Sequence, residues 1–360
     1  MEKLVIDPSF WKDRRVFVTG HTGFKGSWLS LWLNQLGANV TGYALEAPTN
    51  PAVFEIASVQ EALQKSVHGD IRDAVAFTQV MQEAKPEIVI HMAAQSLVRD
   101  SYTDPVGTYS TNVMGTVNML EAARNTLSVK AIVNVTTDKC YENNERAWGY
   151  CENEPMGGHD PYSSSKGCSE LVSAAYRNSF LQDAGIALAT ARAGNVIGGG
   201  DWANNRLVPD AVRAFTSGQP LMIRNPLATR PWQHVLEPLS AYLLLCQHLI
   251  EKPQEFDQGW NFGPNDNDVQ QVSTLANIMT KAWGEKSQWL LDEGAHPHEA
   301  RDLKLDCSKA KTLLNWNPIW GLEQALTETV QWYKAWHSKK DMHEFTLQQI
   351  DNYQQGHLSQ

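Results

Sequence analysis

Two short stretches of the chain carry side chains that could move protons. Tyr162 and Lys166 stand four residues apart, which places them on one face of a helix, and this is the only Tyr-x-x-x-Lys spacing in the sequence. A lysine ammonium beside a phenol stabilises the phenolate and lowers the pKa of the tyrosine towards that of a general base. The second stretch, Thr137-Asp138-Lys139, offers a hydroxyl, a carboxylate and an amine in a row. An exposed helix can carry such a Tyr-Lys pair by chance, and Lys139 can simply form an ion pair with Asp138. The predicted elements around each stretch therefore have to distinguish a catalytic role from a structural one.

Those elements predict that the two stretches meet. Residues 130–135 form a short apolar run, typical of a buried parallel strand, that leads directly into Thr137. Asp160 and Pro161 are a favourable N-cap and first helical residue for a helix that contains Tyr162. Ligands of open parallel sheets gather at the carboxyl ends of the strands, where Thr137 is expected.

A glycine-rich stretch near the start predicts a nucleotide site. Residues 16–19 read as a buried strand and residues 29–36 repeat apolar side chains at helical spacing, so Gly20, Gly23 and Gly26 fall in a strand-turn-helix unit. Such a turn lets the backbone approach a pyrophosphate, whose charge is met by amide N–H groups at the helix start. The cofactor-binding residues predicted in this turn are Gly20, Thr22, Gly23, Phe24 and Gly26.

The second predicted strand, residues 39–45, bears on the kind of dinucleotide. It lacks a terminal acid for the adenosine ribose, Glu46 comes slightly late, and no arginine follows to receive a 2′-phosphate, which favours NAD over NADP. Asp70, after a short strand, could reach the adenine amino group or cap the next helix, and both remain open. Further cofactor contacts are expected from Ile71, Ala93, Asn112, Tyr162 and Lys166.

The order of the predicted strands and helices indicates the fold class. Strands and helices alternate through the first half, which predicts an α/β fold with a doubly wound parallel (Rossmann-type) sheet and a smaller C-terminal substrate-binding lobe. We expect a nucleotide domain over 1–192, a lobe over 193–337 with some returns to the sheet, and a peripheral polar tail over 338–360.

Composition bears on partners and location. The net charge of −10 argues against binding to nucleic acid, and no apolar stretch is long enough to span a bilayer. Five cysteines without metal-ligand or paired spacing predict reduced thiols, no metal site and a cytoplasmic protein.

Several motifs together resemble the extended short-chain dehydrogenase/reductase family, and within it the NAD-dependent nucleotide-sugar epimerases and 4,6-dehydratases. The resemblance runs from residue 19 to about 320. It rests on Thr19-Gly20-His21-Thr22-Gly23-Phe24-Lys25-Gly26-Ser27-Trp28, His91-Met92-Ala93-Ala94-Gln95-Ser96, Thr137-Asp138-Lys139, Tyr162 with Lys166, Arg192-Ala193-Gly194-Asn195-Val196, Asn205-Arg206-Leu207-Val208-Pro209-Asp210 and Arg230-Pro231-Trp232-Gln233-His234-Val235.

The resemblance implies a lyase that removes water from a nucleotide sugar with NAD, in deoxysugar biosynthesis for polysaccharides such as lipopolysaccharide O-antigen. The His-Thr-Gly-Phe-Lys-Gly turn and the Asp138-Lys139 pair point to CDP-glucose as substrate, because similar enzymes that act on dTDP-glucose carry Asp-Glu there. The implied roles are C4 oxidation by Tyr162 with Thr137, removal of the C5 proton by Lys139, and protonation of the leaving 6-OH by Asp138. The implied assembly is a homo-oligomer, a dimer or a tetramer, paired through residues 105–126 and 162–180.

Substrate contacts are expected on both parts of the chain. Arginine forks match phosphate oxygens, so Arg206, Arg230 and Arg301 are candidates for the diphosphate, although each could instead form an ion pair. Ser96 and Asn195 are candidates for the sugar or a phosphate. Two other functions remain open: a nucleotide-sugar 4-epimerase, and a non-catalytic dinucleotide sensor, which typically lacks the tyrosine.

Overall fold

A seven-stranded parallel sheet forms the centre of the molecule. A computed structural model describes residues 6–284, 287–294 and 303–359. The strand order is β11-β6-β5-β4-β1-β2-β3, and every neighbouring pair is parallel, so the doubly wound sheet predicted from the sequence is confirmed. The chain reverses direction across the sheet between β1 and β4, where such sheets bind their ligands. The strands are β1 (Arg15–Thr19), β2 (Asn39–Ala44), β3 (Lys65–His68), β4 (Ile88–His91), β5 (Ala131–Val135), β6 (Ala187–Ala193) and β11 (Gly259–Phe262).

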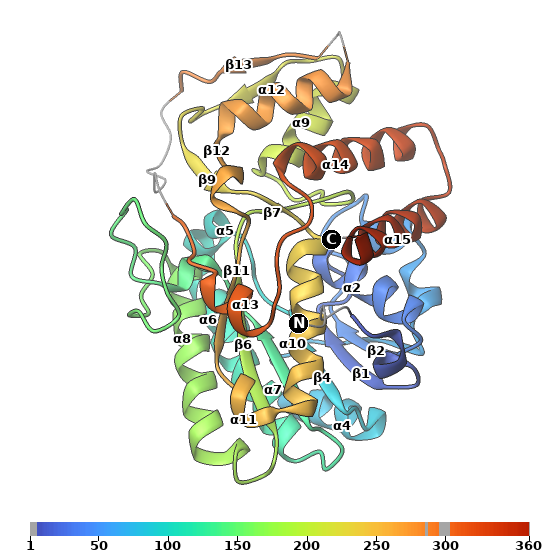
Figure 1. Ribbon diagram of the computed structural model, residues 1–360, viewed down its shortest axis with the longest axis vertical. Helices are drawn as coiled ribbons and strands as arrows, with labels where there is room; N and C mark the ends of the chain where they lie inside the picture. The colour runs from blue at the N-terminus through green and yellow to red at the C-terminus, as the bar shows by residue number, and fades with distance from the viewer. Residues whose placement is uncertain (1–5, 285–286, 295–302, 360) are drawn as a thin grey trace.

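Helices cover both faces of this sheet because alternate strand residues point to opposite sides. Val16 and Val18 of β1 join the apolar core formed with α2 and α10, whereas Phe17 joins the core formed with α4 and α7. The ribbon shows α2 and α10 on one side of the sheet and α4, α7 and α8 on the other (Figure 1). The helical elements around the sheet are α1 (Pro8–Trp11), α2 (Phe24–Gln35), α3 (Val53–Ile56), η1 (Val59–Ala62), α4 (Ala74–Ala84), α5 (Val98–Thr103), α6 (Pro105–Tyr109), η2 (Ser110–Met114), α7 (Gly115–Arg124), η3 (Asp138–Cys140), α8 (Pro161–Tyr176), η4 (Arg177–Leu181), α10 (Leu236–Glu251), α11 (Pro253–Phe256) and α13 (Ser308–Leu313).

Local signals set the ends of these elements. Gly37 has φ +83° just after α2, a left-handed conformation that glycine adopts readily and that commonly ends a helix. Asp160 caps α8, with its Oδ1 accepting from the backbone N–H of Ser163 at 3.0 Å, and Pro161 is the first residue of the helix. Residues 105–124 are helical throughout, with the π-helical turn η2 between α6 and α7.

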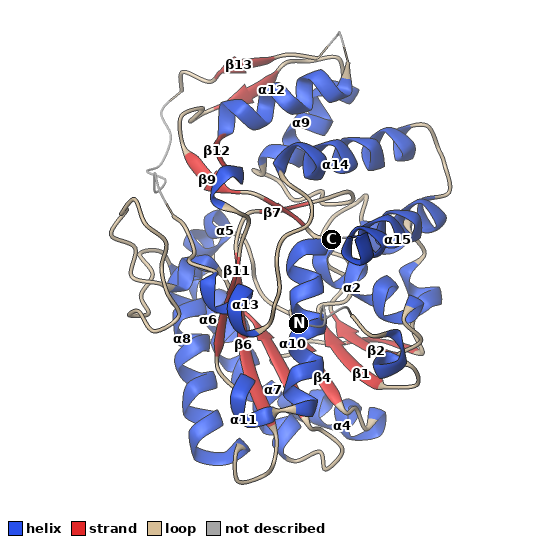
Figure 2. Cartoon of the chain, viewed as in Figure 1, coloured by secondary structure: helices blue, strands red, loops and turns tan. Residues whose placement is uncertain are grey.

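Short strand pairs and three longer helices form a second region beyond the carboxyl ends of the sheet. Figure 2 shows these small strands above the central sheet, with α12 and α14 beside them. The chain returns from this region to the sheet as β11, which pairs with β6. The elements are β7 (Val196–Ile197) with β10 (Gln233–His234), β8 (Leu221–Ile223) with β13 (Trp289–Leu291), β9 (Thr229–Pro231) with β12 (Val269–Gln271), and α9 (Leu207–Thr216), η5 (Asp266–Asp268), α12 (Val272–Trp283) and α14 (Leu322–His337).

The end of the chain differs from the peripheral polar tail expected over 338–360. It forms α15 (Met342–Ser359), and Met342, Ile350 and Tyr353 are buried. The Tyr353 ring packs edge-on against Trp32 of α2 at 5.7 Å between centroids. The polar composition is real, but three apolar side chains on the inner face suffice to dock the helix on α2.

Candidate active site

Two of the three glycines in the first turn are required by close packing. Gly20 has φ +76°, and a Cβ there would lie 2.9 Å from the backbone nitrogen of Ala93. A Cβ on Gly26 would lie 2.1 Å from the Gly20 carbonyl oxygen. For Gly23 the nearest atom would be 3.4 Å away, so the absence of its side chain leaves room above the turn.

The first turn of α2 provides a place for an anion. Its N-cap is Gly23, and no side chain of the described residues caps it. The first amide groups of a helix lack intrahelical acceptors and attract negative charge. Thr22 Oγ1 donates to the Leu45 carbonyl at 2.9 Å and so ties the turn to the end of β2, and Phe24 opens the helix. The room at Gly23 and the uncapped helix start fit the pyrophosphate of a dinucleotide.

Asp70 and Ile71 lie after β3, at the same edge of the sheet. The Asp70 carboxylate accepts from Arg72 Nε at 2.9 and 3.0 Å, and the hydrogen bond from Arg72 lowers the pKa of the Asp70 carboxyl although burial opposes it. The next helix is capped by Asp73, whose Oδ1 accepts from the Ala76 N–H. Helix capping is therefore not the role of Asp70, and its contact with adenine stays a prediction.

Asn112 lies in the π-helical turn η2 and is buried, with both polar side-chain atoms in use. Its Oδ1 accepts from the Gln95 N–H at 2.9 Å, while Nδ2 donates to the Gln95 carbonyl at 2.9 Å and to Ser165 Oγ at 2.8 Å. Asn112 thereby fastens the loop after β4, which contains Ala93 and the exposed Ser96, to the helix of Tyr162. A cofactor contact of Asn112 itself stays a prediction.

The structure brings the two predicted proton-transfer stretches together. Thr137 follows β5 and begins η3, and Tyr162 lies in the first turn of α8 with a side-chain hydrogen bond to Thr137. Lys166, one turn further along α8, donates to the Val135 carbonyl at 3.1 Å. All three side chains are buried at the carboxyl end of β5.

The pKa of Tyr162 differs from the sequence-based expectation. Burial raises it to about 12, with the Thr137 hydrogen bond acting in the opposite direction. Lys166 is not among the main groups that affect this pKa, and its ammonium donates to the Val135 carbonyl. Burial also lowers the pKa of Lys166 to about 8, while the nearby Glu170 carboxylate opposes that change.

Asp138 and Lys139 are in contact but differ in exposure. Lys139 Nζ lies 3.7 Å from Asp138 Oδ1, and the Lys139 side chain is 34% exposed whereas that of Asp138 is fully buried. Thr137 Oγ1 also donates to Asp138 Oδ1, at 3.0 Å. Asp138 Oδ2 has no hydrogen-bond partner among the described residues. A buried carboxylate oxygen of this kind is costly unless a ligand completes it.

Lys25 belongs to the same cluster, although it was not among the predicted site residues. Burial of its ammonium, together with the nearby positive charges of Lys166 and Arg206, lowers the pKa of Lys25 to about 7, although the Asp138 carboxylate opposes this change. Its ammonium lies 5.8 Å from the centroid of the Tyr242 ring. The sequence signal for Lys25 is its place in the His-Thr-Gly-Phe-Lys-Gly turn, between Phe24 and Gly26 at the start of α2.

The predicted substrate residues are distributed unevenly. Arg206 Nη1 pairs with Asp201 Oδ2 at 2.9 Å, and the Arg206 charge acts on the pKa of Tyr162, so Arg206 belongs to the cluster. Asn195, with φ +48°, follows β6, and its buried Nδ2 has no partner among the described residues. Arg230 lies further away on β9, where Nη1 donates to the Thr229 carbonyl. Arg301 lies outside the described residues.

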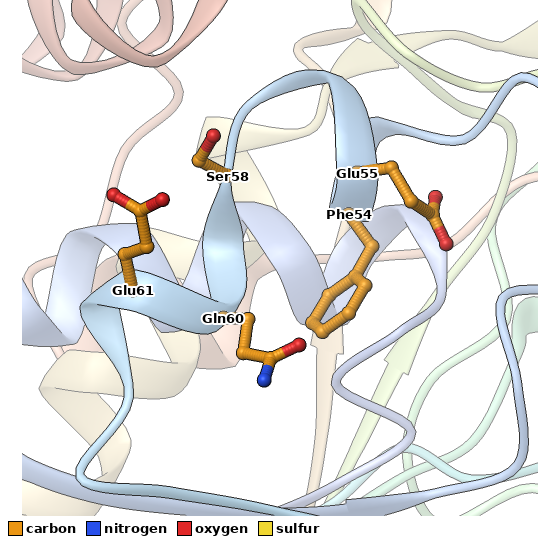
Figure 3. Close-up of a pocket in the computed structure, with 5 residues that line it drawn as sticks. All are labelled: Phe54, Glu55, Ser58, Gln60 and Glu61. Carbon is orange, nitrogen blue, oxygen red and sulfur yellow. The ribbon is translucent and has the colours of Figure 1, made fainter.

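A separate hollow opens between α3 and η1. None of the predicted site residues lines it, and its walls combine one aromatic ring with two carboxylates (Figure 3). The Phe54 ring also packs edge-on against His21 of the glycine-rich turn, 5.5 Å between centroids. The hollow therefore adjoins the back of the turn and takes no part in the catalytic cluster. Its lining residues are Phe54, Glu55, Ser58, Gln60 and Glu61.

A parallel sheet of this order, a glycine-rich first turn and a buried Tyr-Lys pair at the end of β5 define a short-chain dehydrogenase/reductase type of fold. The family model described as GDP-mannose 4,6 dehydratase matches residues 17–329. The chain belongs to that family.

Named relatives agree with this membership. The chain is 55% identical over 354 residues to a CDP-glucose 4,6-dehydratase of Salmonella typhimurium, covering 97% of this chain and 98% of that protein. Two solved structures share the fold: a UDP-glucose 4-epimerase of Thermotoga maritima (TM-score 0.79, 22% identity, 89% of this chain and 99% of that one) and a dTDP-glucose 4,6-dehydratase of Bacillus anthracis in complex with NAD (TM-score 0.74, 24% identity, 91% and 98%).

Proposed function

We propose that this protein converts CDP-glucose to CDP-4-keto-6-deoxyglucose and water, with NAD as a cofactor regenerated in each turnover. The observation that carries this is the buried Asp138 carboxylate, with one oxygen unpartnered among the described residues, beside Lys139 and the Thr137-Tyr162 pair. The 55% identity to a CDP-glucose 4,6-dehydratase over nearly the whole chain supports the choice of substrate.

The chain's own residues divide the proton transfers among them. When bound, NAD supplies a hydride acceptor for C4 of the sugar and the donor that returns the hydride to C6. Tyr162, hydrogen-bonded to Thr137, takes the proton of the 4-OH as C4 becomes a ketone. The C5 proton is then acidic, and Lys139 in its neutral form removes it, while Asp138 in its protonated form gives its proton to the 6-OH, which leaves as water. Lys139 returns a proton to C5 as the hydride reaches C6.

NAD would lie along the predicted cofactor residues. Gly20, Gly23 and Gly26 with the start of α2 fit the pyrophosphate. Glu46 follows β2, where its carboxylate lies 3.2 Å from His68 Nδ1 and its side chain is 86% exposed, so it is available to a ribose hydroxyl. No arginine is present between the end of β2 and Asp70, which supports NAD over NADP. Ala93, Asn112, Asp70 and Ile71 are proposed to line the rest of the cofactor.

A homo-oligomer, dimer or tetramer, is part of this proposal. Apolar side chains are exposed on adjacent helices next to the catalytic helix α8, and α5 and α6 both pack against α8. Burying them against a second copy would remove them from water. Tyr102, Val106, Met114, Leu171 and Phe180 are the exposed residues.

The place of action proposed is the cytoplasm, in the biosynthesis of deoxysugars for polysaccharide such as lipopolysaccharide O-antigen. Within the part of the chain that the structure describes, every helix is too short or too polar to cross a membrane. The net charge of −10 supports a small-molecule partner over nucleic acid.

The test is an assay of the purified protein with CDP-, dTDP-, UDP- and GDP-glucose in the presence of catalytic NAD. Loss of water and a 4-keto product that absorbs near-ultraviolet light in alkali, with CDP-glucose preferred, are expected. Interconversion of glucose and galactose configurations without loss of water would instead identify a 4-epimerase. Binding of NAD without turnover of any of the four would identify a dinucleotide sensor.

A further inference from the structure

A buried ion pair lies directly behind the catalytic turn of residues 137–139. Glu170 of α8 and Arg192 of β6 meet with Arg192 Nη2 2.8 Å from Glu170 Oε2, and their side chains are 5% and 6% exposed. Burial alone would raise the pKa of the Glu170 carboxyl, but the Arg192 charge and hydrogen bonds from Thr136 and Thr190 bring it below its usual value. Glu170 is therefore a buried carboxylate whose two oxygens both accept hydrogen bonds.

The pair contacts both ends of the catalytic turn. Before the turn, Thr136 Oγ1 donates to Glu170 Oε1 at 2.5 Å. After the turn, Arg192 Nη1 donates to the Tyr141 hydroxyl at 2.5 Å, and that hydroxyl donates onward to Asn261 Oδ1 of β11 at 2.7 Å. Thr137, Asp138, Lys139 and Cys140 are thus held between two fixed points on one network.

Glu170 also stands one helical turn after Lys166, on the same face of α8. Its negative charge opposes the loss of the Lys166 proton. The other groups that face Lys166 do less to keep its charge: Lys25 on α2 is a cation, His91 on β4 is a buried imidazole whose pKa burial lowers to about 3, and Cys140 on η3 is a buried thiol. Among these neighbours of Lys166, Glu170 is the one carboxylate that favours the charged form of the lysine.

We infer that Glu170 and Arg192 are positioning residues that brace the segment from Thr136 to Tyr141 and place a negative charge one helical turn from Lys166. This inference rests on the proposed function, since it assigns a purpose to the exact placement of Asp138 and Lys139. It gives the ion pair two separable effects, one on the geometry of the turn and one on the charge of Lys166.

Two variants separate these effects. Glu170→Gln keeps the size of the side chain but removes its charge. Thr136→Val keeps the charge and removes only the hydrogen bond at the start of the turn. Glu237→Gln is the matched control, because Glu237 is also a fully buried carboxylate, bonded to Tyr353 and to the Trp320 N–H away from the turn.

The first measurement is hydrogen exchange of peptides spanning residues 136–141 in the protein without substrate. Both Glu170→Gln and Thr136→Val are expected to exchange faster there, and Glu237→Gln at the parent rate, even where it lowers thermal stability. If hydrogen exchange of residues 136–141 in Glu170→Gln equals the parent rate, the ion pair does not hold this segment in place. Because no substrate is used, this result does not depend on whether CDP-glucose is the substrate.

The second measurement is the pH dependence of kcat for CDP-glucose. In Glu170→Gln the alkaline limb should move to lower pH by about 0.5 unit or more, because an opposing charge has been lost, and kcat should fall more than KM rises. Thr136→Val should lower kcat without moving that limb. If the alkaline limb of the kcat profile in Glu170→Gln stays at the pH of the parent, the proposed effect of the Glu170 charge on Lys166 is wrong. Failure of the parent protein to convert CDP-glucose would instead overturn the proposed function and leave the exchange result standing.

Discussion

The carboxylate of Asp138 rests against the backbone of Gly194. A Cβ built on Gly194 would lie 1.8 Å from Asp138 Oδ2 and 2.1 Å from its Cγ. The space that a side chain at Gly194 would fill, just after β6, is occupied by the Asp138 carboxylate. The next residue, Asn195, has a buried Nδ2 without a partner among the described residues. The close packing of the residues after β5 against those after β6 therefore fixes the orientation of the Asp138 side chain, which is the proposed general acid.

Gly194→Ala should therefore displace Asp138 without touching the cofactor turn. We expect kcat for dehydration to fall by about 10²-fold or more, as for loss of a general acid, with NAD affinity near that of the parent. Gly263→Ala is the control, since a Cβ there would meet only Cys307 Sγ at 3.3 Å and Leu305 Cβ at 3.8 Å. Steady-state kinetics and NAD titration measure both. Equal activity of the two variants would contradict the role of Asp138.

Tyr162→Phe removes the proposed base at C4 and leaves the glycine-rich turn unchanged. Turnover should drop by about 10²-fold or more, because general-base catalysis typically contributes that much. NAD binding, measured by calorimetry, should change little. A large loss of NAD affinity would show that the Tyr162 hydroxyl serves the cofactor or the fold more than the chemistry.

The central sheet could be predicted from sequence because its signals are local. Each buried strand is an apolar run, the end of α2 is marked by Gly37, and the start of α8 is marked by Asp160 and Pro161. The family resemblance implied that Thr137 and Tyr162 act together, and the structure places their side chains in contact at the carboxyl end of β5.

Features that depend on distant packing could not be predicted in this way. α15 has a polar composition, and only tertiary contacts, such as those of Tyr353 with Trp32 and Trp320, show that it belongs to the core. The pKa of Tyr162 depends on how deeply the phenol is buried and on the nearby charges of Asp138 and Arg206, and neither follows from the spacing of Tyr162 and Lys166. Lys25 joins the cluster through the tertiary approach of Arg206 and Lys166, which no local pattern records.

Glu237 predicts a pH dependence of stability. Burial raises the pKa of its carboxyl from 4.5 to about 7, although the Tyr353 hydroxyl and two backbone N–H groups lower it in part. Between these two pH values the folded protein holds a proton that the unfolded chain releases, so this group's contribution to stability falls as pH rises through the window. The change is at most about 3 kcal/mol.

Glu237→Gln should remove that contribution. The amide is neutral at every pH and keeps an oxygen for the Ile319 and Trp320 N–H groups. The midpoint of thermal unfolding should therefore fall less between pH 5 and pH 8 in Glu237→Gln than in the parent. Parallel curves for the two proteins would mean that Glu237 is ionised throughout the range.

Asp138→Asn and Lys139→Ala separate the two halves of the elimination. Asp138→Asn can no longer protonate the 6-OH, so it should slow loss of water more than exchange of the C5 hydrogen with solvent. Both rates can be followed by mass spectrometry with substrate deuterated at C5. If Asp138→Asn slows both equally, Asp138 acts before the elimination, as an orienting group for Thr137 or Lys139.

Lys139→Ala tests the most distinctive assignment at this site. Thr137, Tyr162 and Lys166 remain in place, so oxidation at C4 should still occur, and a 4-keto-glucose nucleotide should build up in a single turnover. Washout of C5 deuterium should slow together with product formation, because the group that takes this proton is gone. If deuterium is lost at the parent rate, Lys139 is not the base. Its ammonium, 3.7 Å from Asp138 Oδ1, would then serve to hold that carboxylate or the charge that develops on the 4-keto oxygen.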